Sequence, residues 1–305
     1  MNRSTRRTVL AAGLANVAIA VTKLIAGIAV GSAAMLAEAA HSMADTLNQG
    51  FLLTSLHRSD RPADADHPFG YGKERYFWSL IAAVGIFVAG GGYSIFEGIL
   101  AITHGGSDTS PLLAYVVLAI AFVAEGSALT RAVYQVRREA RGHRRGFFEQ
   151  VRRSPDTTVR TALFEDVTAL IGLAIAATGL ALREATGSPV WDGAASILIG
   201  LLLVGVAYSL GRTNMHMLIG HAADPDEQRL ITREIESTPG VDTVIELLTM
   251  HLGPEELIVA AKVAFTDDIS ADEAEDLADG LDRRLRERLP IIRHVFLDPT
   301  QLSHS

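Results

Sequence analysis

The sequence predicts a membrane all-α bundle of six transmembrane helices, followed by a cytoplasmic α+β domain of the ferredoxin-like type. Three observations lead to this fold class. Apolar residues gather in six long blocks, basic residues alternate between successive connections, and the composition becomes strongly acidic after residue 221. We therefore expect two domains, a transmembrane domain over residues 1–221 and a soluble domain over residues 222–305.

Each of the six apolar blocks is long enough to cross a hydrocarbon core, which takes about 20 helical residues. They lie near residues 8–30, 33–57, 74–102, 111–136, 155–183 and 190–214. The first block follows three arginines, as the core of a signal peptide would. Its apolar run continues to Val30, however, which is too long for a signal peptide, so we expect a first transmembrane helix here.

The basic residues indicate how the helices are oriented. The connections 31–32, 103–110 and 184–188 contain no Lys or Arg, whereas the segment 137–160 alone contains eight Arg. Basic connections stay on the cytoplasmic side, so both termini are expected in the cytoplasm. We expect an integral protein of a bacterial-type inner membrane.

The last 84 residues read as a separate soluble domain. They hold 19 Asp and Glu against 8 Lys and Arg, an excess of acid that argues against nucleic-acid binding. Their pattern predicts a helix to Thr238, strands over 242–251 and 256–266, a helix over 270–289 and a strand over 291–298. Two helices on one face of a small antiparallel sheet would be a ferredoxin-like layer, which suits homodimerisation.

Polar residues in the second block are the first candidates for chemistry. Glu38, His41, Asp45 and Asn48 follow one another at spacings of three and four, so they share one helix face. Asp45 lies about 18 Å from the outer end of the helix, near the middle of the bilayer. An ionised carboxylate there is costly unless it is paired, hydrated or bound to a cation. An interhelical hydrogen bond is one explanation, but the i, i+4 pair of His and Asp favours a metal site.

The fifth block supplies a second acid at a matching depth. Asp166 lies about 17 Å from the predicted start of the helix at residue 155. Glu165 precedes it, about 100° around the helix, so we expect only one of the two to face His41 and Asp45. The chain has no Cys, which leaves imidazole and carboxylate as metal ligands.

This donor set defines the expected ion and its coupling. One imidazole with several carboxylates fits tetrahedral Zn²⁺, which we favour, and also fits Mn²⁺, Fe²⁺ or Co²⁺. The same groups must lose protons before they bind a cation, so proton antiport follows as a hypothesis. The metal ions and protons would then be transported species, and no resident cofactor is expected.

Other polar groups inside the blocks are expected to be structural. Lys23 and Glu125 could form an interhelical ion pair. Glu97 and Asp192 fall near helix ends, where hydration or capping accounts for them. The glycines at 90–92 lie within an apolar block and predict close helix packing.

Three stretches carry a resemblance to a known family. They are Gly31–Asp45, His67–Arg75 and Phe164–Asp166. From Arg7 to about Pro299 the chain resembles the cation diffusion facilitators, the zinc transporters of the solute carrier 30 type, and most closely the branch that contains the human mitochondrial zinc transporter. The resemblance implies a secondary active transporter rather than an enzyme. It also implies efflux of a divalent cation by proton-coupled alternating access and a homodimer joined through the cytoplasmic domain.

Some positions depart from the family pattern. The family usually has a His or Asp four residues before the fifth-span Asp, where this chain has Ala162. The fourth ligand would then be Glu165, water or a neighbour such as Asn48. The missing ligand also motivates a second hypothesis, a non-transporting scaffold or regulatory homologue with a decayed metal site.

Two accessory metal sites of the family are reduced in this sequence. The loop site keeps Asp64 and His67 but has Tyr71 at its last position. Positions that are histidines in the tail of some relatives are occupied by Ile245, Ala261 and Phe296. The resemblance therefore implies a tail that dimerises rather than one that senses metal. A membrane-embedded metallohydrolase, the third hypothesis, has little support because no further cluster of His and carboxylates gathers at one depth.

Overall fold

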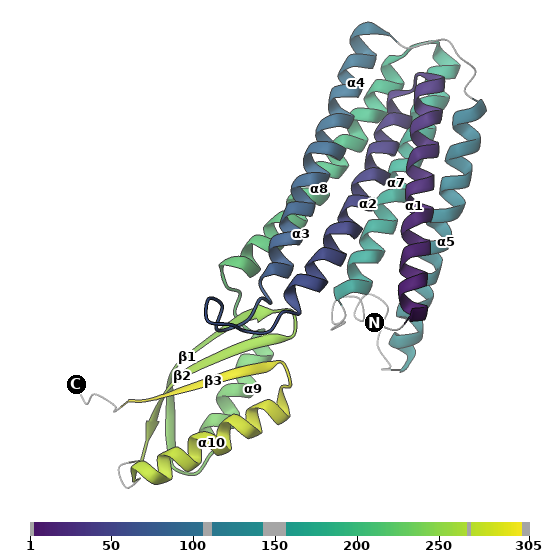
Figure 1. Ribbon diagram of the computed structural model, residues 1–305. Helices are drawn as coiled ribbons and strands as arrows, with labels where there is room; N and C mark the ends of the chain where they lie inside the picture. The colour runs from purple at the N-terminus through teal and green to yellow at the C-terminus, as the bar shows by residue number, and fades with distance from the viewer. Residues whose placement is uncertain (1–2, 106–111, 143–156, 267–269, 301–305) are drawn as a thin grey trace. The chain divides into compact units, whose positions relative to one another are not determined.

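The computed structural model describes residues 3–105, 112–142, 157–266 and 270–300, so the predicted start of the fifth block at residue 155 lies outside the described residues. The chain divides into two compact units, one made of residues 1–50 and 81–210 and the other of residues 51–80 and 211–305. The helices of the apolar region (Figure 1) are α1 (Arg3–Val30), α2 (Ala33–Ser59), α3 (Glu74–Gly85), η1 (Ile86–Gly92), α4 (Tyr93–His104), α5 (Leu112–Gly142), α7 (Thr157–Thr186) and α8 (Val190–Ile219).

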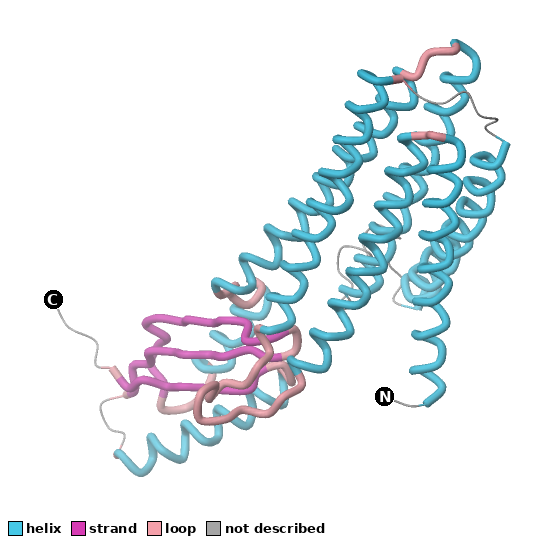
Figure 2. Tube along the Cα trace, turned by 45° about the horizontal axis from the view of Figure 1, so that its top comes forward, coloured by secondary structure: helices cyan, strands magenta, loops and turns pink. Residues whose placement is uncertain are grey.

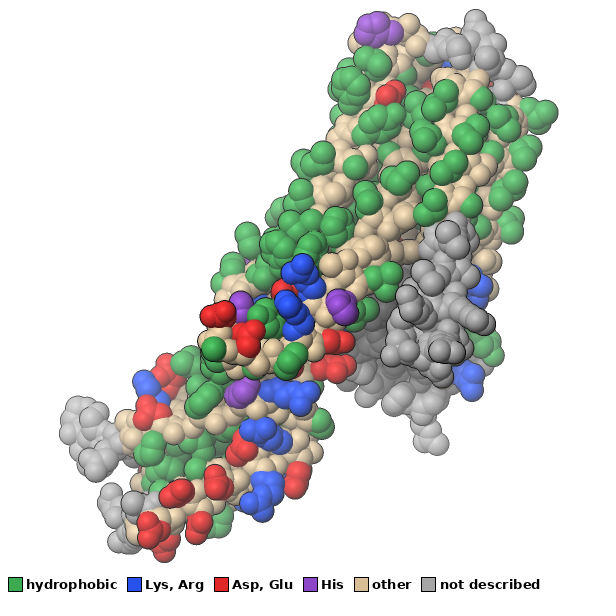
Figure 3. Space-filling view, in the orientation of Figure 1, with side chains coloured by type: hydrophobic (Ala, Val, Ile, Leu, Met, Phe, Trp, Pro, Cys, Tyr) green, Lys and Arg blue, Asp and Glu red, His purple; other side chains and the backbone are tan. Residues whose placement is uncertain are grey.

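Four helical stretches in the described part of the chain are long and apolar enough to cross a membrane. They are Glu74–His104, which joins α3, η1 and α4, then Leu112–Arg138, Glu165–Thr186 and Val190–Ile219. Helix α1 is also apolar from Asn16 to Val30, the part whose side chains the structure describes, and α2 is interrupted by Glu38, His41 and Asp45. Figure 3 shows hydrophobic side chains spread over the visible face of these helices. The findings confirm a transmembrane-type helical region with four clearly apolar helices.

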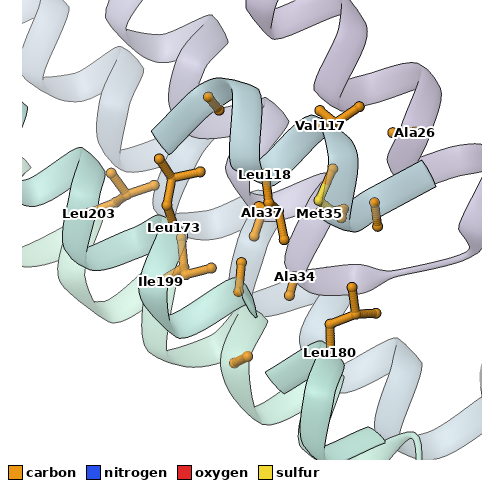
Figure 4. Close-up of a cluster of buried hydrophobic side chains, with 14 of the residues drawn as sticks. Ala26, Ala34, Met35, Ala37, Val117, Leu118, Leu173, Leu180, Ile199 and Leu203 are labelled. Carbon is orange, nitrogen blue, oxygen red and sulfur yellow. The ribbon is translucent and has the colours of Figure 1, made fainter. Parts of the chain in front are cut away.

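Small side chains let the helices of the first unit approach closely. Ala26, Ala34 and Ala37 are buried, and they meet Leu173 and Ile199 in one apolar cluster that draws on α1, α2, α5, α7 and α8 (Figure 4). Alanine at a helix interface lets two backbones approach closely. Such close packing stabilises helix pairs in lipid, where the hydrophobic effect does not drive helices together. The core of this unit therefore combines small alanines, which let the helices approach, with large side chains such as Leu173 and Ile199 that fill the space between them.

Glycines join α4 to α8 at still shorter range. A Cβ added to Gly98 would lie 2.6 Å from the carbonyl oxygen of Gly193, and a Cβ on Gly193 would lie 2.6 Å from that of Gly98. About two turns before Gly98, a Cβ on Gly91 would meet Val204 at 2.8 Å. Gly90 and Gly91 thus pack closely, as predicted, whereas Gly92 is exposed. The three glycines end a π-helical segment that the sequence pattern did not reveal.

The α1–α2 turn is fixed by a buried carboxylate from α8. Gly31 adopts a φ of 65°, a conformation that glycine adopts without steric cost. The Asp192 carboxylate then accepts bonds from the Ser32 hydroxyl and the Ala33 amide, both at 2.7 Å. Arg183 Nη1 lies 3.3 Å from the same carboxylate. Capping therefore explains Asp192, although the helix end that it caps belongs to α2 rather than to α8.

The C-terminal elements follow the predicted order. They are α9 (Pro225–Glu236), β1 (Val241–Gly253), β2 (Glu256–Phe265), α10 (Ala271–Arg288) and β3 (Ile292–Pro299). The strands form one sheet in the order β1-β2-β3 (Figure 2). Strands β1 and β2 are antiparallel, as expected, but β2 and β3 are parallel, so the prediction of a purely antiparallel sheet was wrong. Helix α10 carries the chain back across the sheet between β2 and β3, and such a crossover makes the two strands parallel.

The two faces of this sheet differ in their cover. Leu257, Val259, Ala261 and Val263 of β2 are buried in a cluster with apolar residues of α9 and α10. The alternate residues of β2 therefore face the other side, because side chains alternate along a strand. There Ala260 pairs with Leu248 of β1 and with Phe296 of β3, which are 59% and 51% exposed.

Candidate metal site

A cavity of about 70 Å³ lies between helices of the first unit. It is lined by Asn16 and Ile19 of α1, Ser42, Asp45 and Gln49 of α2, Glu125 of α5, and Glu165, Asp166 and Ala169 of α7. One water needs roughly 10–15 Å³ of such space, so the cavity can hold a small cation with some of its water. Four carboxylates border this small volume, and charges of one sign held so close together favour neutralisation by protons or by a cation.

Each acid stands well inside its helix. Asp45 is about 18 Å along α2 from Ala33, and Glu125 is about 20 Å along α5 from Leu112. Asp166 is about 14 Å along α7 from Thr157. The three α2 residues at the cavity are spaced by three and four, so they lie on one face of that helix.

His41 lies behind Asp45 rather than at the cavity. Its side chain is buried, with the residue only 5% exposed, and neither ring nitrogen has a hydrogen-bond partner among the described residues. The ring Nε2 lies 3.7 Å from Asp45 Oδ2, which is too long for a hydrogen bond. An imidazole buried without a partner is costly and has free coordination capacity.

Both acids of the α7 doublet border the cavity, although the sequence predicted that only one would face the site. Glu165 is held by Asn48, whose Nδ2 donates a hydrogen bond of 3.0 Å to Glu165 Oε1. This bond turns Glu165 toward α2 and leaves Asp166 beside it at the same cavity. The two neighbouring residues of α7 point 100° apart around the helix. Both can border the cavity because α2 and α5 form its other sides.

These residues do not form a closed coordination shell in the structure. Within the described residues, no three side chains of His, Asp or Glu converge closely enough to hold a metal ion. The structure brings Asp45, Glu165 and Asp166 to one cavity and leaves His41 one side chain away from it. Their assignment as ligands therefore stays a prediction.

The predicted ion pair between Lys23 and Glu125 was wrong. Lys23 Nζ instead donates to Glu38 Oε2 at 2.9 Å and to Ser42 Oγ at 2.8 Å. Lys23 and Glu38 stand about 12 Å and 9 Å from the α1–α2 turn, so they lie nearly level on adjacent antiparallel helices. Counting residues from that turn could have found this pair. Glu125 does not pair with Lys23 and instead borders the cavity, a position that the sequence did not predict.

The predicted loop site is occupied by protein hydrogen bonds. The Tyr71 hydroxyl donates to Asp64 Oδ2 at 2.7 Å, and the His67 amide donates to Asp64 Oδ1 at 2.8 Å. These two bonds hold the pKa of Asp64 below its usual range, while the exposed carboxylate gains little from burial. Tyr71 thus closes a loop where a third metal ligand would stand, and a metal at this position finds no support in the geometry.

Comparison with known proteins decides the family. Residues 9–219 match the cation efflux transmembrane domain, and residues 223–298 match the cation efflux protein cytoplasmic domain. The chain belongs to the cation efflux family. The resemblance inferred from the sequence motifs is thereby confirmed.

Several relatives are similar over most of this chain. The proton-coupled zinc antiporter SLC30A9, mitochondrial, of Xenopus laevis is 34% identical over 90% of the chain, and that of Homo sapiens is 37% identical over 80%. Metal tolerance protein C4 of Arabidopsis thaliana is 36% identical over 76%. The matched regions span 56%, 43% and 50% of these relatives, so the chain covers about half of their length.

Proposed function

We propose that this cation efflux protein is a secondary transporter that exports a divalent transition-metal cation in exchange for protons. Zn²⁺ is the first candidate ion, because two of the similar relatives are named as zinc antiporters. Mn²⁺, Fe²⁺ and Co²⁺ are retained as candidates since the donor set is rich in oxygen. The cation is cargo, so the proposal assigns no chemical transformation and no resident cofactor.

One observation carries this proposal, the cavity bordered by Asp45, Glu125, Glu165 and Asp166. Carboxylates inside apolar helices are expensive unless charge is neutralised. A passing cation neutralises them in one state and protons neutralise them in the other. His41, buried 3.7 Å from Asp45, is placed to join the ligands after a small side-chain rotation.

Metal transport is coupled to proton transport because the cation and the protons bind the same carboxylates. A carboxylate that carries a proton cannot ligate, so binding of the cation releases protons, and binding of protons releases the cation. If the site opens to one side of the membrane at a time, each cycle carries metal in one direction and protons in the other. The direction of metal efflux follows the family.

The first test is zinc flux into proteoliposomes. Asp45→Ala and Asp166→Ala are each expected to reduce flux at least about a hundredfold, because each removes a ligand of the cargo. Gly50→Ala serves as a matched control, since a Cβ there meets no atom within 4 Å and Gly50 does not line the cavity. Flux at the wild-type rate in both aspartate variants would sink the proposal.

A second function is favoured by a specific observation, the lack of a closed shell of three ligands among the described residues. Ala162 adds to this, because its methyl group cannot bind metal. In this reading the protein is a non-transporting scaffold or regulator. Calorimetry separates the two, since a scaffold binds none of Zn²⁺, Mn²⁺, Fe²⁺ and Co²⁺, whereas the transporter binds at least one.

We propose a six-span topology with both termini on the same side. Four helical stretches already meet the length and hydropathy of a span, and α1 and α2 would supply the other two. The family matches end at 219 and begin again at 223, which supports a division into domains at 221. A bacterial-type inner membrane has no support here, because the two antiporters are named as mitochondrial. Labelling of an added C-terminal tag from both sides of sealed vesicles tests the topology.

We also propose a homodimer joined through the C-terminal domain. The exposed row of Leu248, Ala260 and Phe296 leaves apolar area on the sheet face away from α9 and α10. Ile245 adds to the same domain a further exposed apolar side chain, 42% exposed. Apolar patches of this kind mark interaction sites. A mass measurement in detergent should give two chains, and a single-chain mass at micromolar concentration would contradict it.

A further inference from the structure

Glu125 on α5 is a half-buried acid that neither the family motifs nor the sequence reasoning placed at the metal site. It stands about 20 Å into a helix that is long and apolar enough to span a membrane. The carboxylate lines the same small cavity as Asp45, Glu165 and Asp166. An acid in this position needs an explanation by a partner.

A structural partner for Glu125 is missing from the described part of the chain. No hydrogen bond and no salt bridge links Glu125 to any described residue. The nearest natural counter-ion would be Lys23, but its ammonium group is engaged by Glu38 at 2.9 Å and by Ser42 at 2.8 Å. Within the described residues, this leaves a proton or a mobile cation to neutralise Glu125.

The other donors at the cavity leave room for one more ligand. A tetrahedral zinc site takes four protein ligands, or three with a water. Asp45 and Asp166 are available, whereas Glu165 already accepts a hydrogen bond of 3.0 Å from Asn48. Ala162, one turn before Asp166, has no donor atom. Glu125 is the remaining charged group that borders the cavity.

A second observation points to a ligand independently of the acids. His41 is 95% buried, and both of its ring nitrogens lack a hydrogen-bond partner among the residues described. Its Nε2 is directed toward the Asp45 carboxylate, 3.7 Å away, which itself lines the cavity. A buried imidazole with two unsatisfied nitrogens, one of them 3.7 Å from a carboxylate of the cavity, fits a cation better than it fits a packed core.

We propose that Glu125 is a direct ligand of the transported cation, so that α2, α5 and α7 all hold it. This inference rests on the proposed function, and it adds a third helix to the site. The donor set then contains more carboxylate oxygen than one His and two Asp provide, which favours acceptance of Mn²⁺ beside Zn²⁺. It also ties the position of α5 to the presence of the cargo.

The test compares Glu125→Gln and Glu125→Asp with wild type in the full-length protein in detergent. Calorimetric titration with Zn²⁺ should show affinity reduced about tenfold or more in Glu125→Gln and reduced less in Glu125→Asp, which keeps the charge. Glu97→Gln is the matched control, because Glu97 also lies within an apolar helix but does not border the cavity. That variant should bind like wild type.

Thermal unfolding separates a ligand from a structural group. A ligand variant should keep the melting temperature of the metal-free wild type and lose the increase that Zn²⁺ produces. Wild-type affinity in Glu125→Gln, together with loss of binding in Asp45→Ala, would overturn this inference and leave the proposed function standing. An equal fall in affinity and in metal-free stability for Gln and Asp would also overturn it. Failure of wild type to bind any of the four metals would remove the proposed function itself.

Discussion

Lys23 and Glu38 form a fully buried ion pair beside the candidate site. Both side chains are 0% exposed, and Glu38 Oε1 has no hydrogen-bond partner among the described residues. The carboxylate also packs against Gly172 of α7, where a Cβ would collide with it. A buried pair of this kind contributes little net stability, but it fixes α1 against α2 through groups that cannot easily part.

Removing one partner of this pair should lower stability, because the other charge is then buried without a counter-ion. Lys23→Met leaves Glu38 buried without its cation, so we expect the free energy of unfolding to fall by about 3–5 kcal/mol. The double variant Lys23→Met/Glu38→Gln should recover most of that loss, because neither charge remains. Unfolding by denaturant in detergent measures both. A single variant as stable as wild type would contradict the assigned pairing.

The site residues show how far single positions could be read from sequence. Asp45, Asp166 and Glu165 were found because a carboxylate in a long apolar run is conspicuous, and all three border one cavity. Glu125 is as conspicuous, but it was paired with Lys23. Which residues pair between two helices depends on how each helix is rotated about its axis. A periodicity of 3.6 residues fixes that rotation only loosely.

At the scale of elements, helix α10 shows a terminus that could be predicted in full. Ser270 is the N-cap, and its hydroxyl oxygen accepts a bond from the Glu273 amide at 3.3 Å. The Glu273 carboxylate in turn accepts a hydrogen bond of 2.9 Å from the Ser270 amide, which completes a capping box. These bonds to Ser270, first to its amide and then to its hydroxyl, hold the pKa of Glu273 below its usual value.

Ser270→Ala should therefore loosen the start of α10. The expected loss is about 1 kcal/mol of local stability, seen as faster amide hydrogen exchange in the first turn of residues 271–288 of the intact protein. Because the pKa of Glu273 is lowered in the folded state, its bonds are present at neutral pH and are lost as the pH falls through that pKa. The difference between variant and wild type should shrink in acid. A difference that grew in acid would contradict the capping box.

Other elements were predicted only in part. The C-terminal helices and strands match their predicted ranges to within two residues, because turns at Gly240 and caps at Ser270 mark their ends. The direction of β3 was missed, because strand pairing is a long-range property that alternation along one strand does not carry. The π-helical segment at 86–92 was missed too, and its Gly91 packs against Val204 of α8, a long-range contact that the local pattern does not carry.

At the scale of the whole molecule, the division of the chain at residue 221 stays a prediction from composition. Acidic residues concentrate after residue 221, while apolar blocks fill the part before it. The structure groups residues 51–80 with the C-terminal unit. The last turns of α2, the loop after it and the start of α3 therefore belong to that compact unit. A break in composition cannot show such contacts, because they depend on how the loop folds rather than on its apolar content.

For the whole molecule, we propose the exchange of a metal ion for protons at carboxylates between the helices. The most direct measurement records zinc and pH together inside proteoliposomes that carry the wild-type protein. The account predicts that entry of Zn²⁺ moves protons the opposite way, that an imposed pH gradient alone can drive zinc uphill, and that Asp166→Ala abolishes both signals. Zinc entry that proceeds with no proton movement, or that survives unchanged in Asp166→Ala, would contradict it.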